Sequence, residues 1–91
     1  MIVILTISHL RRAINEELYK NLTGTSSVVD FETGVDWIKV YFGSGWAYTY
    51  THDSAGRNNV TWMKRHAKRG EELCRYIHKY AKHRYDSKEK Y

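Results

Sequence analysis

The chain has 91 residues and a net charge of +5, and 14% of its residues are aromatic, which is typical of one small domain. A chain of this size buries only about 60–65% of the surface that its unfolded form exposes, which excludes a large core and favours aromatic rings as its filling. A lone cysteine, Cys74, excludes an intramolecular disulfide and fits a reducing, cytoplasmic setting.

The first 24 residues are predicted to form a short apolar segment, either a strand or the lead-in to a helix, followed by an amphipathic helix. Residues 1–7 are apolar but too short to span a bilayer, and no basic region precedes them, so we expect neither a signal peptide nor a membrane anchor. A helix is predicted from an N-cap at Ser8 to a stop at Gly24. Four apolar residues recur every four positions, as on one face of a helix: Leu10, Ile14, Leu18 and Leu22.

Three antiparallel strands are predicted in the middle of the chain, over residues 28–34, 37–42 and 46–51. β-branched and aromatic residues support these strands, and Gly43-Ser44-Gly45 is predicted to form a tight hairpin loop between the second and the third. Because side chains alternate along a strand, Trp46, Tyr48 and Tyr50 are expected on one face of the third.

The remaining residues are predicted to be mostly helical. A polar loop over residues 52–59 ends at Asn58 and Asn59, either of which can cap the next helix. Gly70 is expected to end or bend that helix, and the residues from Asp86 onward are expected to be frayed.

These elements predict a single α+β domain over residues 1–91. A small three-stranded antiparallel sheet is expected to be packed by the N-terminal helix and by a C-terminal helical hairpin or bent helix. Residues 1–24 would form the N-terminal extension of this domain.

The third strand and its surroundings resemble the central motif of a known small domain. The spacing Phe42-x-x-Gly45-x-x-Tyr48-x-Tyr50 is similar to that of the KTSC family, which is named for the C-terminal domain of some lysyl-tRNA synthetases. Further residues fall near the family's glycine, aromatic, isoleucine and tyrosine positions: Gly70, Leu73, Ile77 and Tyr80. The resemblance covers a core of about residues 35–85 and implies RNA binding. A free-standing small member of this kind also resembles the products of phages and mobile elements.

Positive charge is concentrated in the C-terminal part of the chain. Residues 57–91 carry 11 Lys and Arg against four Asp and Glu, whereas residues 1–56 carry four against six. A positive helical surface beside an aromatic strand is suited to hold phosphates and to stack bases. We therefore expect non-catalytic binding of RNA or single-stranded nucleic acid. The expected phosphate-binding residues are Lys64, Arg65, Lys68, Arg69, Arg75 and Lys79, and the expected stacking residues are Tyr48 and Tyr50.

Each of these patterns has a structural alternative. The cations are equally suited to a solvated helix face, and the aromatic residues of the third strand to filling the core. A partner-binding role, in which a phage or mobile-element protein modulates a host nucleic-acid or defence protein, would use Trp37, Trp62 and Tyr76 as anchors. The oligomeric state stays open, a homodimer included.

Catalytic and metal-dependent roles have weaker support in the sequence. A small basic ribonuclease would transfer protons and stabilise phosphate with His66, Arg69, His78 and Tyr80, but no paired carboxylates or nucleophile–base motif accompany them. Cys74 and His78 are spaced to share a metal on a helix, but two ligands are too few. We therefore expect no enzyme activity, no metal and no other cofactor.

Overall fold

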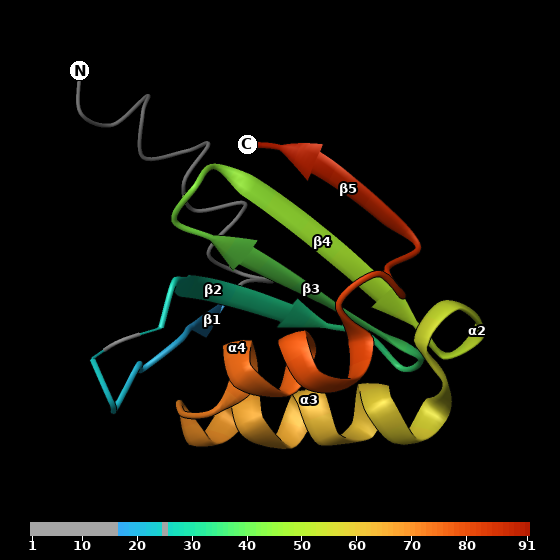
Figure 1. Cartoon of the computed structure of the whole chain (residues 1–91), viewed down its shortest axis with the longest axis horizontal. Coiled ribbons are helices and arrows are strands. Elements are labelled where there is room, and N and C mark those ends of the chain that lie inside the picture. Colours follow the sequence, from blue (N-terminus) through green and yellow to red (C-terminus); the bar gives the residue numbers. More distant parts are fainter. Residues whose placement is uncertain (1–16, 25) are drawn as a thin grey trace.

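A computed structural model describes residues 17–24 and 26–91 and shows a curved antiparallel sheet with helices on one face (Figure 1). The strands are β1 (Glu17–Leu18), β2 (Val28–Thr33), β3 (Trp37–Phe42), β4 (Trp46–Thr51) and β5 (Ser87–Lys90). The helices are α2 (His52–Ala55), α3 (Arg57–Arg69), α4 (Leu73–Tyr76) and the π-helix η1 (Ile77–Ala81). Strand order in the sheet follows the chain, so β1 to β5 form a meander.

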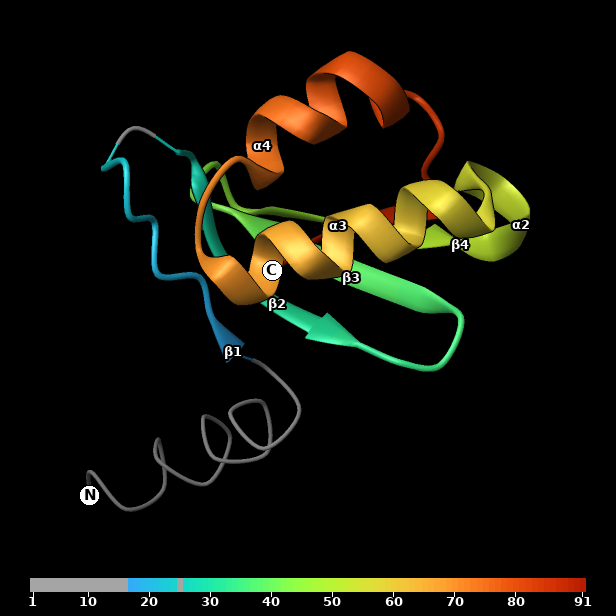
Figure 2. The same ribbon diagram turned by 90° about the horizontal axis from the view of Figure 1, so that it is seen from below.

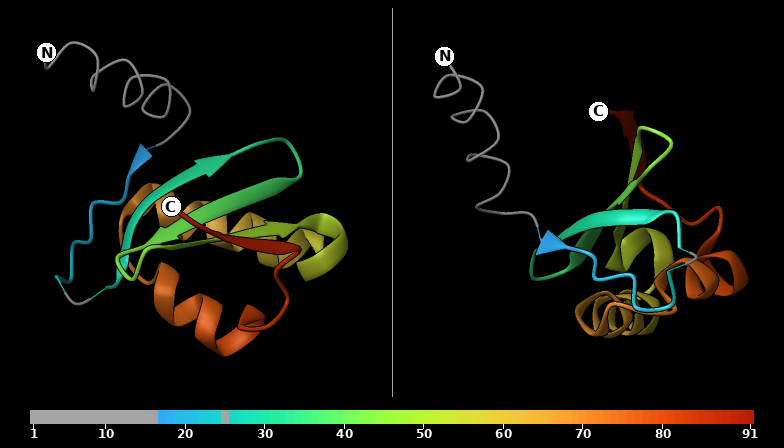
Figure 3. Two further views of the ribbon diagram at one scale, coloured as in Figure 1. Left: turned by 90° about the horizontal axis from the view of Figure 1, so that it is seen from above. Right: turned by 90° about the vertical axis from the view of Figure 1, so that its left-hand side faces the viewer.

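The helices α3 and α4–η1 lie on the same face of the sheet. Seen from below, α3 crosses β3 and β4, and the continuous α4–η1 segment runs beside it (Figure 2). Side views show the two helical segments together on one side of the strands (Figure 3). None of the helices in the described part of the chain is long and apolar enough to cross a membrane.

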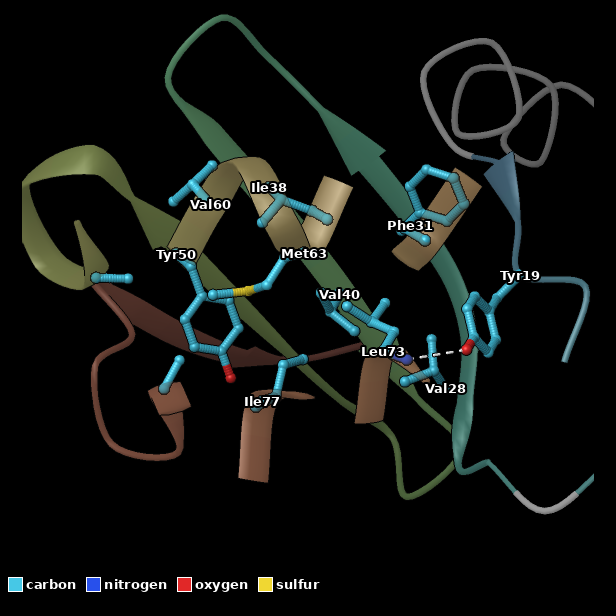
Figure 4. Packing of buried hydrophobic residues seen from close by; sticks show 13 residues of the cluster. Tyr19, Val28, Phe31, Ile38, Val40, Tyr50, Val60, Met63, Leu73 and Ile77 are labelled. Atoms are coloured by element: carbon cyan, nitrogen blue, oxygen red, sulfur yellow. Dashed lines mark hydrogen bonds between the residues drawn. The ribbon is translucent and has the colours of Figure 1, made fainter. Parts of the chain in front are cut away.

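The core lies between the sheet and these helices and follows from alternation along the strands (Figure 4). The sheet contributes Val28, Phe31, Ile38, Val40 and Tyr50, and the helices contribute Val60, Met63, Ala67, Leu73 and Ile77. Each of these side chains is 4% exposed or less. The register places Val40 opposite Phe31 and Ile38 opposite Tyr50, so their side chains share the face that the helices cover.

A glycine turn determines how the two helical segments meet. Gly70, where the sequence predicted that the helix would end or bend, ends α3 in the left-handed conformation, with φ of +80°. A Cβ at this position would overlap the Cβ of Lys20, and the Gly70 carbonyl accepts a hydrogen bond from the backbone N–H of Leu22 at 2.7 Å. The turn therefore requires glycine both for its φ and for the close approach of the segment after β1.

The segment after β1 is joined to the start of α4 by a buried tyrosine. Tyr19 is 5% exposed, and its hydroxyl accepts a hydrogen bond of 3.2 Å from the backbone N–H of Leu73 (Figure 4). This N–H belongs to the first turn of α4, where backbone donors have no partner within the helix. Tyr19 thus adds both buried apolar area and a cap to the helical layer.

The predicted three-stranded sheet is wrong, because the described part of the chain forms five strands. The additional β5 lies within the residues expected to be frayed. It pairs with β4, and Tyr91 beyond it packs edge-on against Tyr41 with ring centroids 5.1 Å apart. A four-residue strand of Ser, Lys and Glu carries no hydrophobic alternation, so backbone pairing with the edge of β4 provides its stabilisation.

The predicted N-terminal helix is also wrong over the residues that the structure describes. Residues 17–18 form β1, and Asn21 has a φ of +53°, which no α-helix allows. Leu18 and Leu22, expected on the packed face, are 82% and 63% exposed. Tyr19, the residue after β1, is buried in place of these leucines, and its backbone N–H donates to the Val29 carbonyl at 2.9 Å. The rest of the predicted helix, with Leu10 and Ile14, lies outside the described residues.

The predicted polar loop before α3 is largely helical. Thr51 caps α2 through a capping box with Ser54, in which each residue's hydroxyl oxygen accepts a hydrogen bond from the other's backbone N–H. The next helix then starts at Arg57, after Gly56, rather than at an asparagine.

The different burial of Met63 and Leu18 predicts that truncating them will have different effects on the free energy of unfolding. Met63→Ala should lower the free energy of unfolding by about 2–5 kcal/mol, because its side chain is fully buried and leaves a cavity. Leu18→Ala should change it by no more than about 0.5 kcal/mol, since the side chain is exposed. Urea denaturation followed by circular dichroism measures both. A large loss at Leu18 would contradict the observed position of β1.

Candidate nucleic-acid interface

A row of four rings crosses from α3 to η1. Trp62 and His66 lie one turn apart on α3, and Tyr76 and Tyr80 lie one turn apart on the α4–η1 segment. Successive ring centroids are 6.0, 5.2 and 4.7 Å apart, with planes tilted by 33–43°. The two end rings are open to solvent, Trp62 at 44% and Tyr80 at 49% exposure. We call Trp62, His66, Tyr76 and Tyr80 the ring row.

The centre of the ring row is held by a hydrogen-bond chain. The Tyr76 hydroxyl donates to Oδ1 of Asn59 at 2.8 Å, and Nδ2 of Asn59 donates to the Ala55 carbonyl at 2.8 Å. Partial burial, with a smaller contribution from Tyr80, raises the pKa of Tyr76, so its hydroxyl stays a donor at neutral pH. The ring of Tyr76 is therefore fixed between α3 and η1 before any ligand arrives.

Cations lie over both ends of the ring row. The Arg65 guanidinium is 4.9 Å from the ring centroid of Trp62, and Nζ of Lys79 is 5.4 Å from that of Tyr80. Both cations are exposed. A cation over a ring is attracted to its π-face and stays accessible to a phosphate. Two residues of the predicted phosphate-binding set thus flank the rings directly.

Three further cations of the predicted set lie on the same helices, each paired with a carboxylate. Lys68 pairs with Glu17 at 3.2 Å, Arg69 with Glu71 at 3.7 Å, and Arg75 with Glu72 at 3.2 Å. Exposed pairs of this kind contribute only about 0.2–1 kcal/mol and are screened by salt. A phosphate can therefore compete for these cations, although the nearby carboxylates reduce the positive potential.

Lys64, the sixth predicted cation, has a structural role instead. Its ammonium donates to the carbonyls of Gly34 and Val35 at 2.6 and 3.1 Å, and so holds the β2–β3 hairpin loop against α3. Those contacts use two of the three donors of the ammonium, so Lys64 is less available to a phosphate than Arg65 or Lys79.

The predicted stacking residues lie away from the ring row. Tyr50 is 1% exposed and faces the helices from β4, where burial strongly raises its pKa. Tyr48 is half-buried, with its ring edge-on between Phe42 at 5.5 Å and Tyr85 at 5.0 Å. The two tyrosines do share a face of β4, as predicted, but it is the face that the helical layer covers.

The residues of the ribonuclease alternative are only partly brought together. Nη2 of Arg69 lies 3.4 Å from Nδ1 of His66, and Tyr80 belongs to the same row. His78 instead lines a recess beside Tyr48. His66 is less basic than usual, because burial, and then the neighbouring Arg69, lower its pKa.

The remaining candidates are placed as follows. Trp37 is half-buried, with its indole beneath Gly34. Cys74 is half-buried beside Ser27, with Sγ 3.7 Å from Oγ. Across residues 17–24 and 26–91, no group of three His, Cys, Asp or Glu side chains could hold a metal ion.

No family model, curated protein or solved structure matches the chain. The KTSC resemblance therefore remains an interpretation of the sequence motif.

The ring row could have been suspected from two aromatic pairs at four-residue spacing, Trp62 with His66 and Tyr76 with Tyr80. That spacing places each pair on one helix face. It does not tell which two faces meet, because the Gly70 turn and the packing of both helices on the sheet decide that.

Because Arg69 contributes to the lowered pKa of His66, removing Arg69 and removing Lys68 should affect this pKa differently. Arg69→Ala should raise the pKa of His66 toward its ordinary value, because a nearby positive charge disfavours the protonated ring. Lys68→Ala, the control, should leave it unchanged, since Lys68 pairs with Glu17 instead. An NMR titration of the imidazole signals measures both. Equal effects of the two variants would contradict the observed contact.

Proposed function

We propose that this protein binds RNA or other single-stranded nucleic acid through the ring row and the cations around it, without catalysis. The observation that carries the proposal is a four-ring row whose exposed ends, Trp62 and Tyr80, each lie beneath a cation. Proteins that bind single strands combine such stacking platforms with a positive surface that follows the backbone.

The exposed rings support contact with unpaired bases. Every base has a π-face, so stacking tolerates any sequence and contributes about 1–3 kcal/mol per base. A base within a duplex is already stacked on its neighbours and has no free face to offer. Single-stranded RNA is therefore expected to compete much better than duplex RNA of the same length.

The arrangement of charge supports contact with phosphates. Arg65 and Lys79 lie at opposite ends of the ring row, and Arg69 and Arg75 lie beside its centre. Lys68 belongs to the same helix as Arg65 and Arg69. A strand stacked along the row would bring phosphates to several of these cations. Affinity should then fall with salt, with a slope of about 0.7 per phosphate neutralised on a single strand.

Removing an exposed ring tests the stacking part of the proposal. Trp62→Ala and Tyr80→Ala should each weaken binding of labelled single-stranded RNA by about 5–150-fold, the equivalent of one stacked base. The dependence on salt should stay the same, because no charge is lost. Fluorescence anisotropy at about 50 and about 200 mM salt measures both quantities. Unchanged affinity in both variants would mean that the RNA binds elsewhere.

Removing the flanking cations tests the electrostatic part. Arg65→Gln combined with Lys79→Gln should reduce the salt slope by about 1.4, or about 0.7 for each lost phosphate contact. Lys39→Gln is the control, because Lys39 lies on the opposite face of the sheet, paired with Glu89. RNA recovered from the assay should be intact. Cleavage would contradict non-catalytic binding, and no binding at the lower salt would contradict the proposal as a whole.

A further inference from the structure

A second recess lies between η1 and the helix-facing side of β4, away from the ring row. Its volume is about 370 Å³. The residues that define its chemistry are Tyr48, Tyr50, His78, Lys82, Tyr85 and Lys88. We call it the β4–η1 pocket. Its size is within the range of about 300–1,000 Å³ that small-molecule sites occupy.

The wall of the pocket is aromatic and held in place by its own ring contacts. Tyr48 lies edge-on between Phe42 and Tyr85, with centroids 5.5 and 5.0 Å away and planes close to perpendicular. Such edge-to-face pairs are favourable and fix the orientation of the rings. The pocket thus offers a preformed apolar surface for a flat, aromatic group.

The mouth of the pocket is positively charged. Lys82 follows η1 and Lys88 belongs to β5, so the two lysines come from different elements, and both are exposed. None of the described residues that line the pocket carries a carboxylate. Glu89 points to the other face of the sheet, where it pairs with Lys39 at 2.9 Å. The charge of these lysines is therefore less neutralised than that of Lys68 and Arg69 on α3, which are paired with carboxylates.

The buried end of the pocket is formed by Tyr50, which is 1% exposed. Its ring adds to the aromatic wall made by Tyr48 and Tyr85. An aromatic wall and two cations at the mouth match the base and the phosphate of a nucleotide.

We propose that the β4–η1 pocket binds one phosphorylated nucleotide, with its base against Tyr48 and Tyr85 and its phosphate at Lys82 and Lys88. The inference does not depend on the ring row and stands or fails separately from the proposed function. The nucleotide is either a free mononucleotide or the phosphorylated end of a strand, because both present the same chemistry.

The test is an NMR titration of the protein with adenosine 5′-monophosphate up to about 10 mM, with adenosine and inorganic phosphate as separate probes. The backbone signals of Tyr48, Lys82 and Lys88 should shift with the monophosphate. Each half-ligand should bind at least about tenfold more weakly, since it lacks either the stacking or the charge. No shift at the pocket, or equal affinity for phosphate alone, would overturn the proposal.

Matched variants locate the binding. Lys82→Gln with Lys88→Gln should weaken binding of the monophosphate by about tenfold or more, as expected when charge-assisted hydrogen bonds are lost. Arg65→Gln with Lys79→Gln removes the same charge from the ring row and should leave the affinity unchanged. The reverse pattern would assign the nucleotide to the ring row and overturn the pocket.

Two RNA oligonucleotides distinguish the sources of the ligand. If a 5′-phosphorylated strand shifts the pocket signals at lower concentration than the mononucleotide, and its 5′-hydroxyl counterpart does not, the ligand is a strand end. If neither strand reaches the pocket while the mononucleotide does, the ligand is a free nucleotide. Both results support the site, and failure of strand and mononucleotide alike contradicts it.

Discussion

The packing of α3 and α4–η1 on one face of the sheet determines where every candidate functional residue lies. Met63, Leu73 and Ile77 are buried against Ile38, Val40 and Tyr50, and the burial of these apolar side chains stabilises the domain. On β4, this contact buries Tyr50 completely and leaves Tyr48 half-buried. On the helices, Trp62 and Tyr80 remain exposed, each beside a cation.

The ring row is a consequence of the turn between α3 and α4. Gly70 ends α3 in the left-handed conformation, and Glu72 also has a positive φ, of 68°, so the chain reverses within a few residues. The reversal brings His66 and Tyr76 to 5.2 Å, which joins an aromatic pair on each helix into one row. Neither pair alone is long enough to hold more than one base. The tertiary turn thus creates the ring row, which we propose stacks bases, from two local patterns.

Local sequence patterns predicted the three central strands. They failed for the segments whose structure depends on contacts with distant parts of the chain. The strands over residues 28–33, 37–42 and 46–51 are rich in β-branched and aromatic residues, and their positions were predicted correctly. Residues 87–90 form β5 because β4 offers an edge, which their polar sequence cannot show. Leu18 and Leu22 match a helical spacing, but pairing of β1 with β2 overrides it. Four of the six predicted cations lie beside the ring row: Arg65, Arg69, Arg75 and Lys79. The contacts of Lys64 and Lys68 with other segments could not be foreseen from their spacing on α3.

Two tryptophans, Trp62 and Trp37, allow binding of single-stranded RNA at the ring row to be tested in one experiment. Trp62 lies at the exposed end of the ring row, while Trp37 is half-buried near the β2–β3 hairpin loop. Unlabelled single-stranded RNA would be titrated into ¹⁵N-labelled protein and the indole N–H signals followed by NMR. The account predicts that the Trp62 signal shifts with a saturating, salt-sensitive curve and that the Trp37 signal stays in place. RNA that binds without moving the Trp62 signal, or that does not bind at all, would contradict it.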